Sequence, residues 1–414
     1  MAPPEAPPEA LPKVASKNAS IPTYTIDLSE PPEERYSQLA EDFASEMKAL
    51  TSLLDEVLQM FIPWRWARKF VEWLASLFLR RVYSAEETEE LRGISKAAGI
   101  DMHFLVALNV LLDSLLGCTS GGIMTSLSEK SEHNKRMMHF RTLDWGMDAL
   151  RSVLVILVFV NSDIDEDAVI GRSITYAGFV GTLTGVRKDL SVSLNFRPSH
   201  SCSTLSLRKH QLLVLLGYRP SIGSIIRSMI VPSEVEKQKN PIPLSDQLNT
   251  FPKLRCPPCY LVLCDGTRTA VVQRDLDSTK VRMDTECIIV TNHDTEFTSS
   301  KWFFNPTGRR GKSSLGIKMR DWVQDSLERS ACVWRKWSGV KKRLRKQLLE
   351  DGAKSEDLEQ GGWASVRLKT LEGWLKADPV MNECTHFMCV MDPKTGLIRF
   401  LERGPAPEDT ESKS

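Results

Sequence analysis

Hydrophobic and polar residues repeat with different periods along the chain, and the first part is patterned mainly for helices. Residues 24–28 alternate as a β-strand does. Pro31-Pro32-Glu33-Glu34 then predicts a helix start, because prolines and acidic residues both suit a first helical turn. Ser84-Ala85-Glu86-Glu87 is a capping box and predicts a second start. Residues 93–116 continue as a helical pattern with a break near Gly99.

From Gly117 onward the pattern changes to short strands, some of them separated by glycine clusters that are typical of turns. The expected strands are Arg136–Phe140, Val153–Val160, Ser173–Ala177, Ser191–Asn195, Cys259–Cys264, Ala270–Gln273 and Cys287–Thr291. Helices are expected at Leu205–Leu216 and Ser221–Met229, and a closing hairpin at Thr385–Met391 and Leu397–Leu401. This order predicts an α+β fold with large sheets and a helical insertion at about 306–380.

The segment from Leu53 to Arg81 is amphipathic and rich in aromatic residues, with arginines and lysines between them. It has two interpretations. In the first, the aromatic side chains pack in the core and the arginines face solvent. In the second, the helix lies on a membrane surface, with its tryptophans at the interface and its arginines among the headgroups. The basic run from Trp334 to Lys346 is expected to be a solvated helix face, or to add affinity for anionic lipids.

Charge and composition narrow the classes of function. The 54 basic and 53 acidic residues leave a net charge of +1, which gives no support for nucleic-acid binding. Residues 1–20 are rich in proline, alanine and glutamate, so we expect a disordered tail, and they lack the basic and apolar regions of a secretory signal. We therefore expect reduced cysteines and a protein that is cytoplasmic or peripheral on the cytosolic face of a membrane, not lysosomal. No apolar stretch reaches the length of a membrane span.

Cys118 is the candidate nucleophile, and the motifs downstream of it are the reason. It follows a helical stretch and begins Cys-Thr-Ser-Gly-Gly. A cysteine considered alone is more often a small buried hydrophobic residue than a nucleophile. Four further motifs follow in order: His139-Phe140-Arg141-Thr142-Leu143-Asp144-Trp145-Gly146, the glycine-rich segment 176–185, Asn195-Phe196-Arg197 and Thr291-Asn292-His293-Asp294.

Together these motifs resemble the acid ceramidase and N-acylethanolamine acid amidase family of N-terminal-nucleophile hydrolases, which are related to choloylglycine hydrolase. The resemblance implies an αββα sandwich with an N-terminal helical segment. It also implies autoproteolysis between Gly117 and Cys118, which would leave an N-terminal (α) chain ending at residue 117, structured from 21, and a catalytic C-terminal (β) chain, 118–414, associated as a heterodimer. The implied activity is hydrolysis of the amide bond of an N-acyl lipid, ceramide first and N-acylethanolamine second.

The resemblance also assigns roles to site residues. Arg141 matches the arginine that stabilises the thiolate, Asp144 the aspartate that receives the new α-amine, and Asn292 the asparagine that donates to the oxyanion. Arg309, in Gly308-Arg309-Arg310, is matched to the arginine that follows the asparagine. A free α-amine has a pKa of about 7.7–8.0 and can act as a base beside its own thiol.

One departure from the family and one other segment leave alternatives open. Phe196 stands where the family often has glutamate, which motivates an inactive lipid-binding relative; a membrane-surface scaffold that uses 53–81 is the other alternative. Cys256-Pro257-Pro258-Cys259 has the spacing of zinc and redox pairs, but no second ligand pair lies nearby in the sequence. No cofactor or metal is implied.

Overall fold

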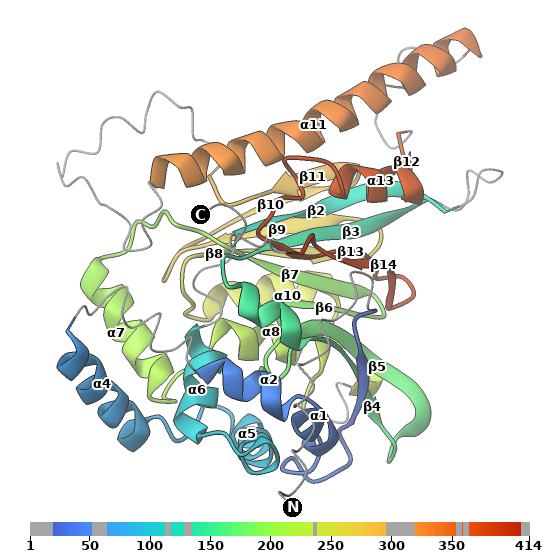
Figure 1. Cartoon of the computed structure of the whole chain (residues 1–414). Helices are drawn as coiled ribbons and strands as arrows, with labels where there is room; N and C mark the ends of the chain where they lie inside the picture. Colours follow the sequence, from blue (N-terminus) through green and yellow to red (C-terminus); the bar gives the residue numbers. More distant parts are fainter. Residues whose placement is uncertain are drawn as a thin grey trace, which may run out of the picture.

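Two β-sheets form the centre of the molecule (Figure 1). The computed structural model describes residues 20–51, 64–111, 117–127, 135–234, 238–294, 319–352, 358 and 364–406. The eight-stranded sheet has the order β1 (Thr23–Asp27), β4 (Leu154–Asn161), β5 (Asp165–Tyr176), β6 (Thr184–Arg187), β7 (Leu190–Phe196), β8 (Cys259–Cys264), β9 (Thr269–Arg274) and β10 (Thr279–Asp284). The six-stranded sheet has the order β11 (Cys287–Val290), β2 (Gly117–Ser126), β3 (Lys135–Asp144), β13 (Thr385–Asp392) and β14 (Leu397–Arg403), with β12 (Val366–Arg367) beside β2.

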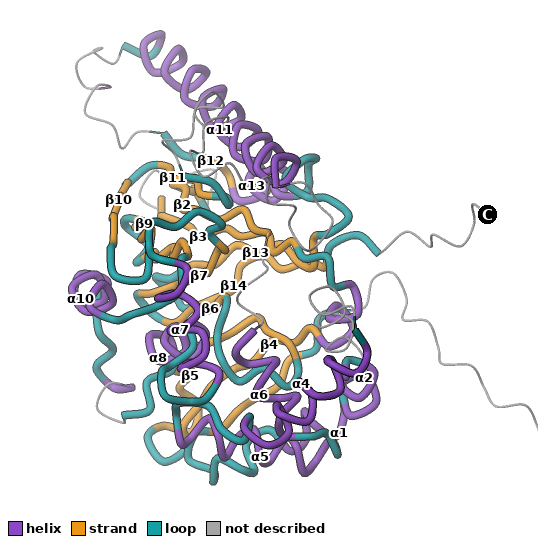
Figure 2. The backbone as a smooth tube through the Cα atoms, turned by 90° about the vertical axis from the view of Figure 1, so that its left-hand side faces the viewer, coloured by secondary structure: helices purple, strands orange, loops and turns teal. Residues whose placement is uncertain are grey.

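Helices cover the outer faces of both sheets, as the views along two directions show (Figures 1 and 2). On the side of the eight-stranded sheet lie α1 (Ser37–Asp42), α2 (Ala44–Ala49), α4 (Arg65–Phe78), α5 (Ala85–Ala98), α6 (Met102–Leu111), α7 (Thr204–Leu215), α8 (Ile222–Ile230) and α10 (Leu244–Thr250). On the side of the six-stranded sheet lie α11 (Met319–Glu350) and α13 (Leu368–Leu375). This layering confirms the predicted αββα sandwich.

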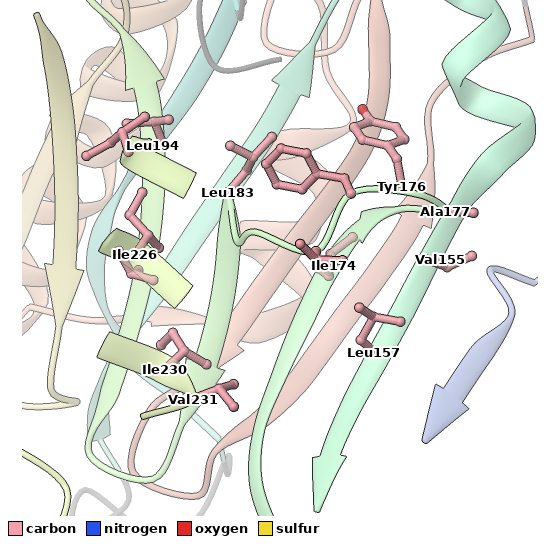
Figure 3. Close-up of a cluster of buried hydrophobic side chains, with 14 of the residues drawn as sticks. Val155, Leu157, Ile174, Tyr176, Ala177, Leu183, Leu194, Ile226, Ile230 and Val231 are labelled. Atoms are coloured by element: carbon pink, nitrogen blue, oxygen red, sulfur yellow. The ribbon is translucent and has the colours of Figure 1, made fainter. Parts of the chain in front are cut away.

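The apolar side chains of the layers form two large buried clusters. In the first, residues of β4, β5 and β7 pack against Ile226 and Ile230 of α8, as Figure 3 shows. In the second, Val333 and Trp337 of α11 pack on Phe140 of the six-stranded sheet. Burial of these faces removes apolar surface from water, at roughly 25 cal/mol per Å², and therefore fixes the positions of α8 and α11 on their sheets.

The strand that begins beside Cys118 is set deeply between its neighbours. A Cβ atom built on Gly121 would lie 2.1 Å from the Ile288 carbonyl oxygen, and one on Gly122 would lie 1.8 Å from Thr269 Oγ1 in the other sheet. A larger residue at Gly121 would clash with the neighbouring strand β11, and one at Gly122 would push the two sheets apart. The two glycines of Cys-Thr-Ser-Gly-Gly therefore allow close packing of β2 against β11 and against the other sheet.

Most predicted elements are confirmed within a few residues, and the differences have physical reasons. Ser84 caps α5 by accepting a hydrogen bond from the Glu87 N–H, as the capping box predicts. The strand β2 was not predicted, because its glycines and small polar residues carry no apolar alternation. The helix at 319–350 is a single 32-residue element where helices and loops were expected. Residues 1–19, 52–63 and 295–318, with the calls made on them from sequence, lie outside the described residues.

The first interpretation of the aromatic segment, that it packs in the core, is wrong for its described part. On α4 and just before it, Trp64, Trp66, Phe70 and Trp73 are 53–73% exposed, whereas Arg68 is buried. Apolar side chains therefore face solvent on this helix. None of the described helices combines the length and apolar character needed to cross a bilayer.

Candidate active site

Cys118 is the second residue of β2, and its side chain is completely buried between the two sheets. Its nearest charged neighbour is Arg141, whose Nη2 lies 3.2 Å from the sulfur. The sulfur also lies 3.7 Å from the Leu194 carbonyl oxygen of β7. Burial raises the pKa of the Cys118 thiol, and the Arg141 charge opposes this effect. The Arg141 guanidinium is therefore a neighbouring cation that stabilises the ionised form of the thiol.

Arg141 is held rigidly in this position. It lies on β3, two residues along the same face from Leu143, which pairs with Cys118 in the antiparallel register. Its Nη1 donates to the Leu183 carbonyl oxygen and to Thr184 Oγ1, and its Nη2 donates to the Leu194 carbonyl oxygen at 2.8 Å. The glycine-rich segment thus supplies acceptors for the guanidinium. Arg141 is 0% exposed, so it is not a solvated charge on a strand surface.

Asp144 is the last residue of β3 and belongs to the opposite face of the same sheet. Arg329 of α11 donates to Asp144 Oδ2 at 3.1 Å, and Thr385 Oγ1 donates to Oδ1 at 2.7 Å. Burial raises the pKa of Asp144 to about 6 against the lowering effects of Arg329 and Thr385. The carboxyl group therefore changes its charge close to neutral pH.

Asn292 lies just after the end of β11 and contacts residues from both faces of the six-stranded sheet. Its Oδ1 accepts from the Cys118 backbone N–H at 2.8 Å and from Arg329 Nη2 at 3.2 Å. Both partners can only donate, so the orientation of the amide is fixed, with Nδ2 donating to the Phe196 carbonyl oxygen at 2.8 Å. In the intact chain, Asn292 therefore holds the peptide nitrogen of the predicted cleavage site. The predicted role of Asp144, to receive an α-amine, concerns the cut chain and stays a prediction.

The structure brings Cys118, Arg141, Asp144 and Asn292 together, and it adds an arginine that the sequence did not identify. Arg309 lies outside the described residues. The arginine that contacts both Asp144 and Asn292 is Arg329, which is 1% exposed and also donates to Thr119 Oγ1 at 2.9 Å. The choice of Arg309 rested on its position in an arginine pair. Arg329 also donates from Nε to Asp325, four residues earlier on the same helix face, but such pairs are common on helices and do not mark a site residue in the sequence.

Asn195 supports the site from the eight-stranded sheet. Its Oδ1 accepts from Ser120 Oγ at 2.7 Å, and its Nδ2 donates to the carbonyl oxygens of Val290 and Thr291. This buried amide links β7 to β2 and to the end of β11, just before Asn292. Its own neighbour Phe196 is half-buried and contributes its carbonyl oxygen to Asn292.

The two cysteines of Cys-Pro-Pro-Cys are buried in the protein interior near Arg274. The Cys256 sulfur accepts from Arg274 Nε at 3.2 Å. Arg274 also donates to the backbone carbonyl oxygens of Pro252 and Leu254. Cys256 therefore lies in a loop that is folded around a buried guanidinium, and Cys259 begins β8.

The arrangement suits acyl transfer by a cysteine. It contains a thiol beside a guanidinium, an asparagine amide on the backbone of the same cysteine, and a carboxyl group with a raised pKa nearby. Activation of a thiol by an adjacent cation and stabilisation of an oxyanion by neutral donors are the two main requirements of this chemistry.

Comparison with known proteins finds one matching family model and several relatives. Residues 19–83 match a family model described as the beta subunit of N-acylethanolamine-hydrolyzing acid amidase. The chain is 31% identical over 187 residues to a Caenorhabditis elegans N-acylethanolamine-hydrolyzing acid amidase, covering 42% of this chain and 48% of the relative. It is 25% identical over 301 residues to human acid ceramidase, covering 66% and 70%. The chain spans about half the length of the first relatives, 48% and 56%.

A solved structure of a Caenorhabditis elegans orthologue of N-acylethanolamine-hydrolyzing acid amidase is 20% identical in sequence, with a TM-score of 0.43, and covers 67% of this chain and 93% of that one. The sequence matches confirm the predicted relationship to the family of acid ceramidase and N-acylethanolamine acid amidase.

Proposed function

We propose that this relative of the acid ceramidases and N-acylethanolamine acid amidases is an N-acyl amide hydrolase that cuts its own chain before Cys118. The observation that carries the proposal is that two separate residues contact Cys118, one at its sulfur and one at its backbone nitrogen. The Cys118 sulfur lies 3.2 Å from Arg141 Nη2, while its backbone nitrogen donates to Asn292 Oδ1 at 2.8 Å. A nucleophile and its own peptide nitrogen are thus held by separate, buried groups.

Self-cleavage would use the Cys118 thiol on the preceding peptide bond. The thiol loses its proton, and the sulfur attacks the Gly117 carbonyl carbon. The bond between this carbon and the Cys118 nitrogen then breaks, and the nitrogen takes up a proton and becomes an amine. Water hydrolyses the resulting thioester, which leaves a Gly117 carboxylate and a free thiol. Arg141 stabilises the developing thiolate, and Asn292 Oδ1 accepts from the nitrogen throughout.

Turnover would repeat the same chemistry on a lipid amide. The Cys118 thiolate attacks the amide carbonyl carbon of the substrate, and its α-ammonium group protonates the leaving amine. Water then hydrolyses the thioester and releases the fatty acid. Asn292 Nδ2 is the proposed donor to the oxyanion, and Asp144 is the proposed anchor of the α-amine. A neutral amide suits this role because the negative charge exists only in the transition state.

The proposed substrate is ceramide, with N-acylethanolamine as the second candidate. Support for ceramide comes from the longer matches to acid ceramidases, which cover 66% of this chain against 42% for the amidase. Side-by-side hydrolysis of an N-acylsphingosine and an N-acylethanolamine that carry the same fatty acid tests the order. A higher kcat/KM for the ethanolamide would reverse it.

Peripheral membrane contact through α4 is part of the proposal. Trp66, Phe70 and Trp73 are exposed on a helix that also carries Arg65 and Lys69. Exposed apolar patches of this kind mark interaction surfaces, and aromatic residues beside cations suit the interface of a bilayer. A substrate that resides in a membrane would reach the enzyme from this surface.

The first experiment is intact-mass measurement of purified wild-type and Cys118→Ala protein after incubation from about pH 4 to pH 8. Two fragments that divide between Gly117 and Cys118, in the wild type only, would support the proposal. An uncut wild-type chain without activity toward either lipid amide would favour the inactive lipid-binding relative that Phe196 suggests.

A further inference from the structure

Helix α11 reaches the end of β11 with a serine that no role has been assigned to. Ser326 is completely buried, one helical turn before Arg329. Its Oγ accepts from the Asn292 backbone N–H at 2.8 Å. The same oxygen lies 2.9 Å from Thr291 Oγ1 and 2.9 Å from His293 Nδ1. One hydroxyl group therefore touches three consecutive residues around the asparagine of the site.

The hydrogen bonds of this cluster form one consistent set. Ser326 Oγ donates its hydrogen to Thr291 Oγ1, and Thr291 Oγ1 donates its hydrogen to the Ser326 carbonyl oxygen at 3.0 Å. Both hydroxyl hydrogens are then used. His293 Nδ1 lies 3.0 Å from Thr291 Oγ1 and 2.9 Å from Ser326 Oγ, and in this set it is the donor to them. The Ser326 lone pairs then accept from the N–H groups of His293 and Asn292.

We propose that Ser326 is a positioning residue for Asn292, an inference that rests on the proposed function. β11 ends at Val290, so the N–H of Asn292 lies beyond the sheet ladder, and Ser326 supplies its acceptor. Arg329, one turn further along α11, donates to the side-chain oxygen of the same asparagine. The backbone and the side chain of Asn292 are thus fixed by two residues on one face of one helix.

These hydrogen bonds to Asn292 matter because its proposed role depends on the orientation of its side-chain amide. Its Oδ1 must face the Cys118 nitrogen while its Nδ2 faces the Phe196 carbonyl oxygen. A displacement of well under an ångström at such a donor reduces transition-state stabilisation without removing the binding surface for the lipid. Loss of the Ser326 hydroxyl should therefore lower kcat and leave KM nearly unchanged.

The experiment compares Ser326→Ala and Ser326→Cys with Ser338→Ala, a control at an exposed serine on the same helix. Cysteine nearly preserves the size of serine but is a weak acceptor, so it tests hydrogen bonding with little change in packing. The fraction of chain cut before Cys118, kcat and KM per cut chain on an N-acylsphingosine, and the thermal unfolding midpoint are measured for each variant.

We expect kcat of Ser326→Ala to fall about 10- to 100-fold with KM within about twofold of wild type, and self-cleavage to slow as well. Ser326→Cys should lie between it and wild type, and Ser338→Ala should match wild type. If Ser326→Ala does not fold, Ser326→Cys carries the same test. Wild-type kcat in the folded serine variants, or a loss that only follows the unfolded fraction, would overturn the inference. An inactive, uncut wild type would instead refute the proposed function, and the inference would fall with it.

Discussion

Replacement of Arg329 by glutamine is the perturbation that examines the site most directly. The Arg329 guanidinium is 1% exposed and donates to Asp144, Asn292 and Thr119. Glutamine keeps part of the length and the polarity but removes the charge. The buried Asp144 carboxylate would then lose its cation and keep the hydrogen bond from Thr385 as its main support.

The size of the effect follows from this loss. Removal of one partner of a buried ion pair typically costs about 3–5 kcal/mol, because the remaining charge is left uncompensated. The cost should depend on pH. The pKa of Asp144 is already raised to about 6, and loss of Arg329 raises it further. At about pH 5 the carboxyl group is protonated in the variant and needs no cation, so the destabilisation shrinks as pH falls.

Urea unfolding of Arg329→Gln and wild type at about pH 5 and about pH 7 measures this difference. Arg335→Gln, the same change at an exposed arginine of the same helix, is the matched control and should behave as wild type. The double variant with Asp144→Asn should be less destabilised than the sum of the single changes, because the partners interact. An equal loss at both pH values, or none, would refute the reasoning.

Three further predictions address other groups. Cys118→Ala should remain a single chain in intact-mass measurements under every condition in which the wild type is cut. A raised pKa means that folding favours protonated Asp144, so wild type should gain unfolding midpoint relative to Asp144→Asn as pH falls from about 7 to about 4.5; a constant difference would contradict this. Serine at Trp66, Phe70 and Trp73 should reduce co-sedimentation with liposomes without changing self-cleavage, and equal binding would remove α4 from the proposed membrane contact.

The fold could be predicted from the sequence wherever periodicity was strong. Strands such as Cys259–Cys264 and Leu154–Asn161 are apolar enough to identify, and Ser84 announces its helix by a capping box. The strand β2 could not be predicted from periodicity, because close packing replaces its apolar face with glycines at 121 and 122. The exposure of the aromatic residues of α4 could not be predicted either, since an amphipathic pattern does not say which environment covers the apolar face.

The site was predictable only as far as ordered motifs reach. Arg141, Asp144 and Asn292 stand in recognisable segments, and the structure places all three around Cys118 or its partners. Arg329 stands in no such segment. Its role depends on where α11 packs, and that is decided by Val333 and Trp337 on the six-stranded sheet, far from the motif itself. Packing of this kind is a tertiary property that spacing along the chain does not record.

The pleat of the six-stranded sheet would let the same few residues serve both proposed reactions, self-cleavage and amide hydrolysis. Cys118 and Arg141 belong to the face between the sheets, whereas Asp144 and Arg329 meet on the face under α11. Asn292, beyond the strand end, touches the backbone of Cys118 and the guanidinium of Arg329. The thiol and the carboxyl group both ionise to anions, and on opposite faces each has its own cation, Arg141 for Cys118 and Arg329 for Asp144. The α-amine formed by self-cleavage would lie at the end of β2, between the Cys118 thiol and the Asp144 carboxyl group. There it could exchange a proton with either group. The proposed cut would therefore add the missing base without rearranging the groups already in place.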